Sequence, residues 1–432
     1  MNRLPVVVES PDALGLLSDQ IKTHGRAGPT VVLTDATPKF LAGDDRNLTD
    51  LVADMLPDAN MTVLGHDEGL LLADETTVAA AVAAGAGAGC LVSIGSGTLT
   101  DLGKLASHQA GVPLVAVPTA ASVNGYSYHL AVVLRAGAKR TVPAAAPAAL
   151  VVDHRALAGA PVTMGRAGLG ETVGAIVAPA DWLLAAAIGA DPTYDADIVR
   201  SYHRPAAVLM ELSLGIDGRR PEALAALFRL LTAAGLAMGK AGRTAPLSGT
   251  EHAVSHLLDM AAGLDHGLHG TQVGVAAVVA ACLWEVALVG LDLESGFSIP
   301  DDRILAEILS TAFTRLGAAT VEECWSDYRV KPAHWRSAPP DRRSLATIGD
   351  QAMAWLGTPA EMSAVLVAAG APTRFSDLDP PIDPATARWA VVNAHLLRSR
   401  FTILDLVLFT GGDVAQVVDD ALARASEVGG GL

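Results

Sequence analysis

The sequence predicts two domains, an α/β domain over residues 1–158 and an all-α domain over residues 159–432. Up to about residue 153, short runs rich in Val, Ile and Leu alternate with helical segments, which is typical of a parallel sheet covered by helices. After about residue 160 the pattern becomes long, Ala- and Leu-rich and helical. A chain of 432 residues suits about two such domains.

Five short apolar runs carry the strand prediction in the first domain. The expected strands are 30–34, 61–64, 90–94, 113–117 and 149–152. Prolines divide the second domain, with breaks expected at Asp191-Pro192, Arg220-Pro221 and Pro246 and in loops over 332–341 and 377–384. The longest apolar tract, 273–291, contains Glu285 and two glycines, so we expect a buried core helix there and no membrane insertion.

Composition narrows the function classes. A net charge of −16 argues against nucleic acid as a partner, because phosphate binding needs a basic surface. An anionic substrate would therefore need a locally positive site. The three cysteines are too few and too scattered for a disulfide framework or a thiolate zinc site. The N-terminus shows no basic segment followed by a long apolar run, so we expect no signal peptide and a cytoplasmic protein.

A glycine-rich junction follows the third expected strand. This strand ends at Ile94 and runs through Gly95-Ser-Gly-Thr98 into an expected helix. Glycines at such a junction let the backbone approach a pyrophosphate, whose charge is met by free amides and the helix dipole. The alternative is a tight strand-to-helix turn that binds nothing.

Two further features support a nucleotide site. Asp35 follows the strand 30–34, where a carboxylate can bind the adenosine ribose and disfavour the 2′-phosphate of NADP. Alternatively, Asp35 only opens the turn over 35–38. A polar loop, 118–126, follows the strand 113–117 at the carboxyl edge of the sheet, where open α/β folds bind their ligands.

Histidines at helical spacing indicate a metal site in the second domain. His252 and His256 lie one helical turn apart, and His269 opens the next apolar segment. Helical domains present nitrogen ligands to one divalent metal in this way. Ser248 and Glu251 have the spacing of a capping box, so we expect Glu251 to bind backbone donors. The alternative is that these histidines are satisfied polar residues between helices.

The linear order of these motifs resembles the bacterial sn-glycerol-1-phosphate dehydrogenases, of the iron-containing alcohol dehydrogenase and dehydroquinate synthase-like superfamily. The motifs that carry the resemblance are 95–104, 118–125, 167–171, Asp181-Trp182, 248–252, 268–273 and 397–405. The resemblance implies a Rossmann-like dinucleotide-binding domain and a helical metal-binding domain. It also implies hydride exchange between NAD(P)H and dihydroxyacetone phosphate, with zinc or nickel as the metal and iron as a further candidate.

The resemblance also implies individual site residues. The implied metal ligands are Glu171, His252 and His269. The implied pyrophosphate contacts are Gly95, Ser96, Gly97 and Thr98, with Asp101 and Lys104 on the following helix. The remaining implied contacts are Thr119 and Ser122 at the nicotinamide, Asn124 at the substrate, and His256 as a substrate contact or a supporting residue.

Three positions depart from the family. Glu171 stands where the dehydrogenases have aspartate, Ala175 where a lysine often follows, and Tyr128 where a small residue is usual. Related sugar-phosphate cyclases use glutamate at the first position and employ NAD transiently. The first hypothesis is therefore interconversion of dihydroxyacetone phosphate and sn-glycerol 1-phosphate. The second is a dehydrogenase or cyclase acting on a larger sugar or nucleoside phosphate, and the third is a binding protein without turnover. A small phosphorylated substrate and a homodimer are expected.

Overall fold

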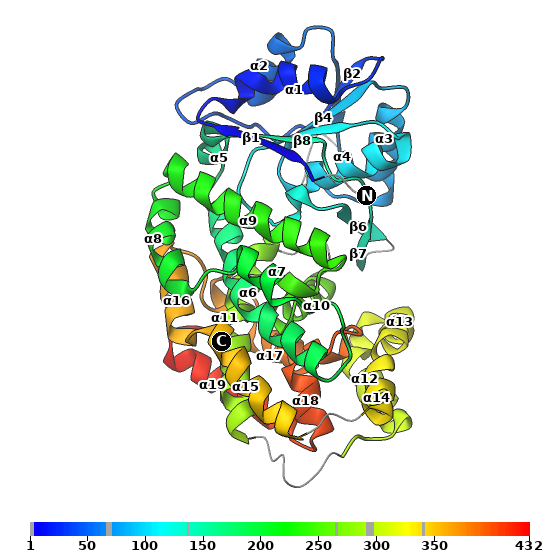
Figure 1. Cartoon of the computed structure of the whole chain (residues 1–432), viewed down its shortest axis with the longest axis vertical. Coiled ribbons are helices and arrows are strands. Elements are labelled where there is room, and N and C mark those ends of the chain that lie inside the picture. The colour runs from blue at the N-terminus through cyan, green and yellow to red at the C-terminus, as the bar shows by residue number, and fades with distance from the viewer. Residues whose placement is uncertain (1–3, 66–70, 136–137, 264–266, 291–297, 339–341) are drawn as a thin grey trace. The chain divides into compact units, whose positions relative to one another are not determined.

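The structure, a computed structural model, describes residues 4–65, 71–135, 138–263, 267–290, 298–338 and 342–432 (Figure 1). The chain forms two compact units, the first comprising Met1–Gly168 and Leu212–Gly239, the second Leu169–Glu211 and Lys240–Leu432. Residues 212–239 thus group with the N-terminal sheet, whereas the sequence assigned them to the range 159–432. The division into folding domains 1–158 and 159–432 stays a prediction.

A six-stranded parallel sheet forms the centre of the first unit (Figure 1). Across the sheet, its strands are β1 (Val6–Ser10), β8 (Ala149–Asp153), β5 (Leu114–Pro118), β4 (Cys90–Gly95), β2 (Thr30–Asp35) and β3 (Asn60–Leu64). The strands β4, β5 and β8 are buried throughout, as expected for parallel strands covered on both faces. The edge strands β1 and β3 are partly exposed.

Side chains of the strands β2, β4 and β5 alternate between two apolar layers, because successive residues of a strand point to opposite faces. On β4, Val92 joins one layer and Leu91 the other. The helices that contribute to the Val92 layer are α1 (Leu17–His24) and α2 (Leu48–Met55). The helices that contribute to the Leu91 layer are α3 (Glu75–Gly85) and α4 (Gly97–Ala110). Both faces of the sheet are therefore covered.

The predicted fold class is confirmed, and all five expected strands are present with ends shifted by at most one residue. Two features were not predicted. One is the edge strand β1, whose only signal is a short valine run after Pro5. The other is an antiparallel hairpin of β6 (Leu130–Arg135) and β7 (Ala138–Pro143). The run over β6 is rich in Leu, Ala and Val, and short apolar runs of this kind leave helix and strand ambiguous.

Helix α9 (Pro221–Ala241) packs on the loop after β5, within the first unit. Ser127 Oγ donates to the carbonyl oxygen of Thr232 at 3.0 Å, and the Tyr126 and Phe228 rings lie 5.1 Å apart. A Cβ at Gly235 would lie 2.5 Å from the carbonyl oxygen of Asn124, so only glycine permits this approach. The loop is thus held between the sheet and a helix that lies about 100 residues further along the chain. The first unit also contains α5 (His154–Gly159) and part of α8 (Ala206–Asp217).

The second unit is helical over its described residues, apart from an isolated bridge between Arg374 and Gly431. Its helices include α6 (Val162–Ala187, which begins in the first unit), α7 (Ala196–Tyr202), α10 (Thr250–Ala262), α11 (His269–Gly290), α12 (Asp302–Phe313), α13 (Ala318–Tyr328), α14 (Val330–Ser337), α15 (Arg342–Leu356), α16 (Pro359–Ala368), α17 (Pro384–Asn393), α18 (Ile403–Phe409) and α19 (Val414–Glu427). One expectation was wrong: the start of the loop predicted over 332–341 is helical. Pro332 lies in the first turn of α14, where its missing N–H has no helical partner to lose. Residues 339–341 lie outside the described residues.

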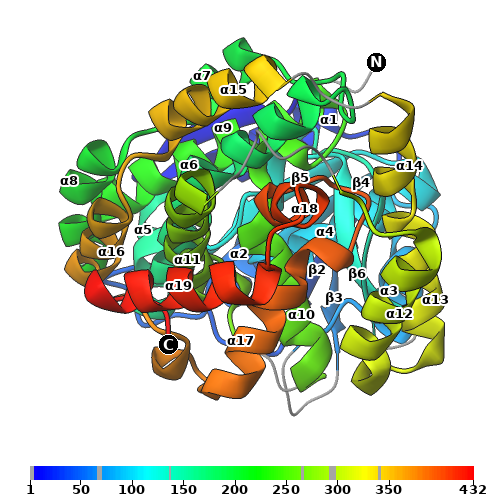
Figure 2. The ribbon, with the colours of Figure 1, turned by 90° about the horizontal axis from the view of Figure 1, so that it is seen from below.

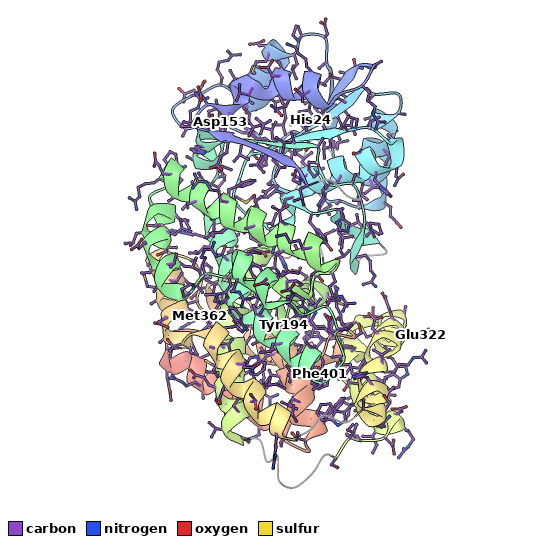
Figure 3. The ribbon with its side chains drawn as sticks, viewed as in Figure 1. His24, Asp153, Tyr194, Glu322, Met362 and Phe401 are labelled. Carbon is purple, nitrogen blue, oxygen red and sulfur yellow. The ribbon has the colours of Figure 1, made fainter. Side chains whose placement is uncertain are left out.

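Helix α11 lies at the centre of the second unit, where α10, α16, α18 and α19 pack against it. Figure 2 shows α19 beside α11. An aromatic cluster packs in the same unit, with the ring of Phe401 (labelled in Figure 3) 5.5 Å from Trp335 and 5.7 Å from Phe409. Trp335 and Phe401 are about 1% exposed, so this cluster forms part of the core.

By length and composition alone, three described helices could cross a membrane, namely α6, α9 and α11. In the structure, 94%, 56% and 78% of their apolar windows are buried inside the protein. For α6 and α11, packing in the protein core accounts for the apolar composition. The buried helix expected over 273–291 is α11, and residue 291 lies outside the described residues.

Candidate functional site

Three helices of the second unit bring together Glu171, His252 and His269, the residues expected to bind a metal. Glu171 lies on α6, His252 in the first turn of α10, and His269 is the first residue of α11. Nε2 of His252 lies 3.6 Å from Oε2 of Glu171, and Nε2 of His269 lies 3.7 Å from Oε1. One ligand atom from each residue lies within 4.8 Å of the others.

Glycines on α6 and α11 allow this convergence. A Cβ at Gly170 would lie 2.0 Å from the carbonyl oxygen of Gly270, and a Cβ at Gly274 would lie 2.9 Å from Cα of Gly170. The two helix backbones therefore touch, which no larger residue would permit. Because Gly170 precedes Glu171 and Gly270 follows His269, this contact sets the distance between the side chains of Glu171 and His269.

The donor set fits a divalent metal. Two ligands each about 2.1 Å from one ion at a tetrahedral angle lie about 3.4 Å apart, close to the spacing of Glu171 from either histidine. One carboxylate with two imidazoles is a combination that zinc, nickel and iron all accept. Three protein ligands leave coordination positions open, as a catalytic site requires.

A carboxylate orients His252. Nδ1 of His252 lies 2.8 Å from Oε1 of Glu251, so the ring donates from Nδ1 and turns Nε2 toward Glu171. Burial alone would lower the pKa of His252, but hydrogen bonds to Glu171 and Glu251 outweigh burial and raise it to about 9. The negative charge that attracts a proton to this ring also favours a divalent cation.

A neutral relay orients His269. Ser255 Oγ lies 2.8 Å from Nδ1 of His269 and donates its own proton to Oε1 of Gln272 at 2.6 Å. Since the hydroxyl proton is used for Gln272, the hydroxyl oxygen accepts from Nδ1–H of His269. Nε2 of His269 is then the unprotonated nitrogen on the side of Glu171. Partners of this kind fix the tautomer of metal-binding histidines.

His256 lies next to the three residues without joining their group. Its ring stacks on His269 with centroids 5.4 Å apart and lies 6.4 Å from the ring of His252. The expected spacing of one turn from His252 on α10 is therefore present. Its role as a substrate contact or a supporting residue stays a prediction.

The expected capping box at the start of α10 paired Ser248 with Glu251, and the prediction was wrong for Ser248. The residue that precedes the helix is Gly249, and its N–H donates to Oε1 of Glu251 at 2.7 Å. Ser248 Oγ instead accepts from Nη1 of Arg400 at 2.6 Å. Glu251 does bind a backbone donor as expected, but the same oxygen also accepts from His252.

Two buried charges that were given no role from the sequence support the start of α10. Oδ2 of Asp181 accepts from N and Oγ1 of Thr250, each at 2.8 Å, and Oδ1 accepts from Ile403 N at 3.1 Å. Burial, together with the negative charge of Glu251, raises the pKa of Asp181 to about 7. Burial lowers the pKa of Arg400 to about 10. The sequence motif contained Asp181, but nothing local indicated these distant partners.

The expected nucleotide residues lie at one edge of the sheet in the first unit. Gly95 ends β4 opposite Pro118 of β5, and its carbonyl oxygen accepts from Thr119 N at 3.1 Å. Ser96 is the N-cap of α4, and Gly97 and Thr98 form its first turn. The amide end of α4 therefore lies at the carboxyl edge of the sheet, which is the arrangement that binds phosphate groups.

Asp101 and Lys104 hold α4 to its surroundings. Lys104 is fully buried and donates to Asp101 Oδ1 at 2.6 Å, to the carbonyl oxygen of Gly125 at 2.8 Å and to that of Leu130 at 2.5 Å. Asp101 Oδ2 accepts from Val132 N at 2.9 Å. These bonds fix the loop and β6 beside α4, while contact of Asp101 or Lys104 with a pyrophosphate stays a prediction.

The loop after β5 carries the other expected contacts. Ser122 is buried, and its Oγ lies 3.2 Å from the hydroxyl of Tyr126, which donates to the carbonyl oxygen of Ala120 at 2.7 Å. Thr119 is about 9% exposed, and Asn124 begins the 3-10 helix Gly125–Ser127. The contacts of Thr119, Ser122 and Asn124 with nicotinamide or substrate stay predictions.

Asp35 is the last residue of β2 and has a partner that the sequence did not reveal. Its Oδ1 binds Nζ of Lys39 and accepts from Thr37 N at 3.2 Å. Asp35 thus does help to form the turn after β2, which was the alternative interpretation. The sequence does place opposite charges four residues apart, at Asp35 and Lys39. That spacing predicts a contact between two side chains only within a helix, so it did not indicate this pair.

Comparisons with known proteins agree with this fold. The family model described as iron-containing alcohol dehydrogenase matches residues 8–161. A relative from Halobacterium salinarum, named glycerol-1-phosphate dehydrogenase with NAD(P)+, is 30% identical over 318 residues, covering 68% of this chain and 86% of its own. A relative of the same name from Halalkalibacterium halodurans is 31% identical over 283 residues, covering 63% and 69%. The chain therefore belongs to the glycerol-1-phosphate dehydrogenase family, among the iron-containing alcohol dehydrogenases.

Solved structures show the same fold at lower identity. A crystal structure of a probable glycerol dehydrogenase from Sinorhizobium meliloti 1021 covers 99% of this chain and 98% of its own, with a TM-score of 0.60 and 17% identity. At this identity the likeness concerns the fold alone.

Proposed function

We propose that this protein interconverts dihydroxyacetone phosphate and sn-glycerol 1-phosphate, with NAD(P)(H) and one divalent metal ion. The observation that carries the proposal is the convergence of Glu171, His252 and His269 in a chain of this family. The names of the relatives support the substrate, and the parallel sheet with its glycine-rich junction supports the dinucleotide. A small phosphorylated substrate follows from the same names.

When bound, the metal supplies a Lewis acid toward the substrate oxygens, and the nicotinamide supplies or accepts two electrons. The chain's own residues prepare the site for both. Glu171 contributes a negative charge that lies against both histidine nitrogens. Glu251 and Ser255 accept the Nδ1 protons of His252 and His269, so Nε2 is the nitrogen of each ring that faces Glu171 and would bind the metal.

The remaining roles follow the family resemblance. Backbone amides of Gly95 to Thr98, at the positive end of α4, would receive the pyrophosphate. The residues proposed for the nicotinamide side are Thr119 and Ser122, and those proposed for the substrate are Asn124 and His256. The hydrogen bond between Ser122 and Tyr126 and the packing of the Asn124 backbone on α9 hold this loop in place.

The metal is proposed as zinc, nickel or iron, since nitrogen and carboxylate ligands suit all three. The family description adds weight to iron. A homodimer, a cytoplasmic location and the absence of nucleic-acid and membrane partners stay predictions of the sequence. A cyclase or dehydrogenase for a larger sugar or nucleoside phosphate is not favoured, because the relatives reported above are named glycerol-1-phosphate dehydrogenases.

The proposal is tested by removing metal, restoring zinc, nickel or iron separately, and following NADH oxidation with dihydroxyacetone phosphate. A stereospecific assay of the product should find sn-glycerol 1-phosphate. His252→Ala and His269→Ala should each lose stoichiometric metal and activity together. His24→Ala on α1, which is outside the candidate metal site, should keep both. A metal-loaded wild type that is inert toward dihydroxyacetone phosphate would contradict the proposed function.

A further inference from the structure

Lys39 lies against Asp35 at the carboxyl end of β2. Its Nζ binds Oδ1 of Asp35 and donates to the carbonyl oxygen of Thr37 at 2.8 Å. A longer contact of 3.5 Å reaches Oγ1 of Thr34. The side chains of Lys39 and Asp35 are only 9% and 15% exposed, so the surrounding protein holds this ion pair in place.

The pair lies beside the junction expected to bind the dinucleotide. β2 and β4 are neighbours with Leu33 opposite Ser93, and Asp35 and Gly95 each follow two residues later. Asp35 and Gly95 therefore end adjacent parallel strands at the same edge of the sheet. In open α/β folds that bind a pyrophosphate at one such end, the acidic residue at the neighbouring end meets the adenosine ribose.

The two carboxylate oxygens of Asp35 have different surroundings. The bonds from Lys39 and Thr37 both reach Oδ1. Within the described residues, Oδ2 has no hydrogen-bond partner, so it can accept from a ribose hydroxyl. A lone carboxylate at this place repels the 2′-phosphate of NADP, but an adjacent ammonium group cancels that charge. Lys39 can also exchange its long contact with Thr34 for a phosphate oxygen.

We propose that Lys39 allows this chain to accept the 2′-phosphate of NADP(H), so that Asp35 does not restrict the cofactor to NAD(H). This inference rests on the proposed function, because it takes the junction at Gly95 as the dinucleotide site. Asp35 binds the ribose of NAD(H) through Oδ2, and Lys39 binds the additional phosphate of NADP(H). The pair thus serves both cofactors, in contrast to the preference for NADH that Asp35 alone would produce.

The test is titration of the full-length protein with NADH and with NADPH, followed by nicotinamide fluorescence. Wild type should bind the two with dissociation constants within about tenfold of each other. Lys39→Met should lower the affinity for NADPH by about 10–100-fold, the range of one lost charge-assisted hydrogen bond, and change the affinity for NADH by less than about threefold. Lys39→Arg should retain the affinity for NADPH, and Asp35→Asn should raise the affinity for NADPH relative to that for NADH.

Lys22→Met is the matched control, because Lys22 is a 77% exposed residue of α1 and its loss changes the net charge equally. It should leave both affinities unchanged. Equal weakening of NADH and NADPH in Lys39→Met would overturn the inference, as would a wild type that binds NADH and rejects NADPH. A wild type that binds neither cofactor would instead contradict the proposed function, so the two failures are distinguishable.

Discussion

His252 and Glu251 are adjacent in the sequence and joined by a 2.8 Å hydrogen bond from Nδ1 to Oε1. Because residues next to each other on a helix point in different directions, this bond requires Glu251 to fold back along the start of α10. The bond leaves Nε2 of His252 on the side of Glu171. A carboxylate thus orients one of the two candidate metal-binding histidines, and a hydroxyl orients the other.

Removing the carboxylate of Glu251 should weaken metal binding. Glu251→Ala should lower metal affinity by roughly 10–100-fold, as loss of a partner of a ligating histidine does. Glu251→Gln can keep the acceptor without the charge, so its loss should be smaller. Competition with a chromogenic chelator and the visible absorbance of bound Co²⁺ measure both. The matched control is Glu361→Ala, which removes a glutamate that caps α16. Equal affinity in Glu251→Ala and wild type would contradict the assigned role.

Shortening Glu171 should be tolerated. Glu171→Asp restores the ligand length of the family, so it should keep stoichiometric metal and avoid the roughly 100-fold loss that a 1 Å displacement can cause. Glu171→Gln has nearly the same size but no charge, and it should lose the metal. Metal analysis and NADH oxidation with dihydroxyacetone phosphate measure both variants. A metal-loaded Glu171→Asp with activity far below wild type would show that the pocket depends on the longer side chain.

Separating α6 from α11 should disturb both stability and metal binding. The added methyl group in Gly170→Ala would lie 2.0 Å from the carbonyl oxygen of Gly270, and overpacking of this kind costs about 1–3 kcal/mol or more. The same separation moves Glu171 from His269, so metal affinity should fall as well. Thermal unfolding and chelator competition test this. Gly15→Ala, where the new methyl group meets nothing within 4 Å, should show neither effect.

His395 should make the protein sensitive to acid. Burial, followed by the charge of Lys331, lowers the pKa of His395 from 6.5 to about 3. The unfolded chain therefore binds a proton below pH 6.5 that the folded chain refuses, and stability is lost as pH falls from 6.5 toward 3. At pH 5 this loss is about 2 kcal/mol relative to pH 8. Urea midpoints at pH 8 and pH 5, with chelator present, should fall less in His395→Asn than in wild type. The same fall in both proteins would show that another group dominates.

Much of the sheet could be predicted because its signal is local. Strands such as β4 and β5 are buried on both faces, and continuous apolar runs record that burial. β1 lies at the edge of the sheet and is half exposed, so its apolar run is short and gave no prediction. The candidate metal ligands were predicted through motifs, since His252 and His269 lie at helix starts that the sequence marks, and that they bind a metal stays a prediction.

The sequence by itself therefore determined the fold class, the positions of five of the six strands of the parallel sheet and the residue types of the candidate metal site. Only the tertiary structure decided which polar atoms meet. Asp181 accepts a hydrogen bond from Ile403, 222 positions further along the chain. Ser255 on α10 forms hydrogen bonds with both His269 and Gln272 on α11. Even the near pair of Lys39 and Asp35 depends on how the chain turns after β2. Hydrogen bonds act over about 3 Å, and the close approach of helices and turns that sets such distances arises only when the whole core is packed.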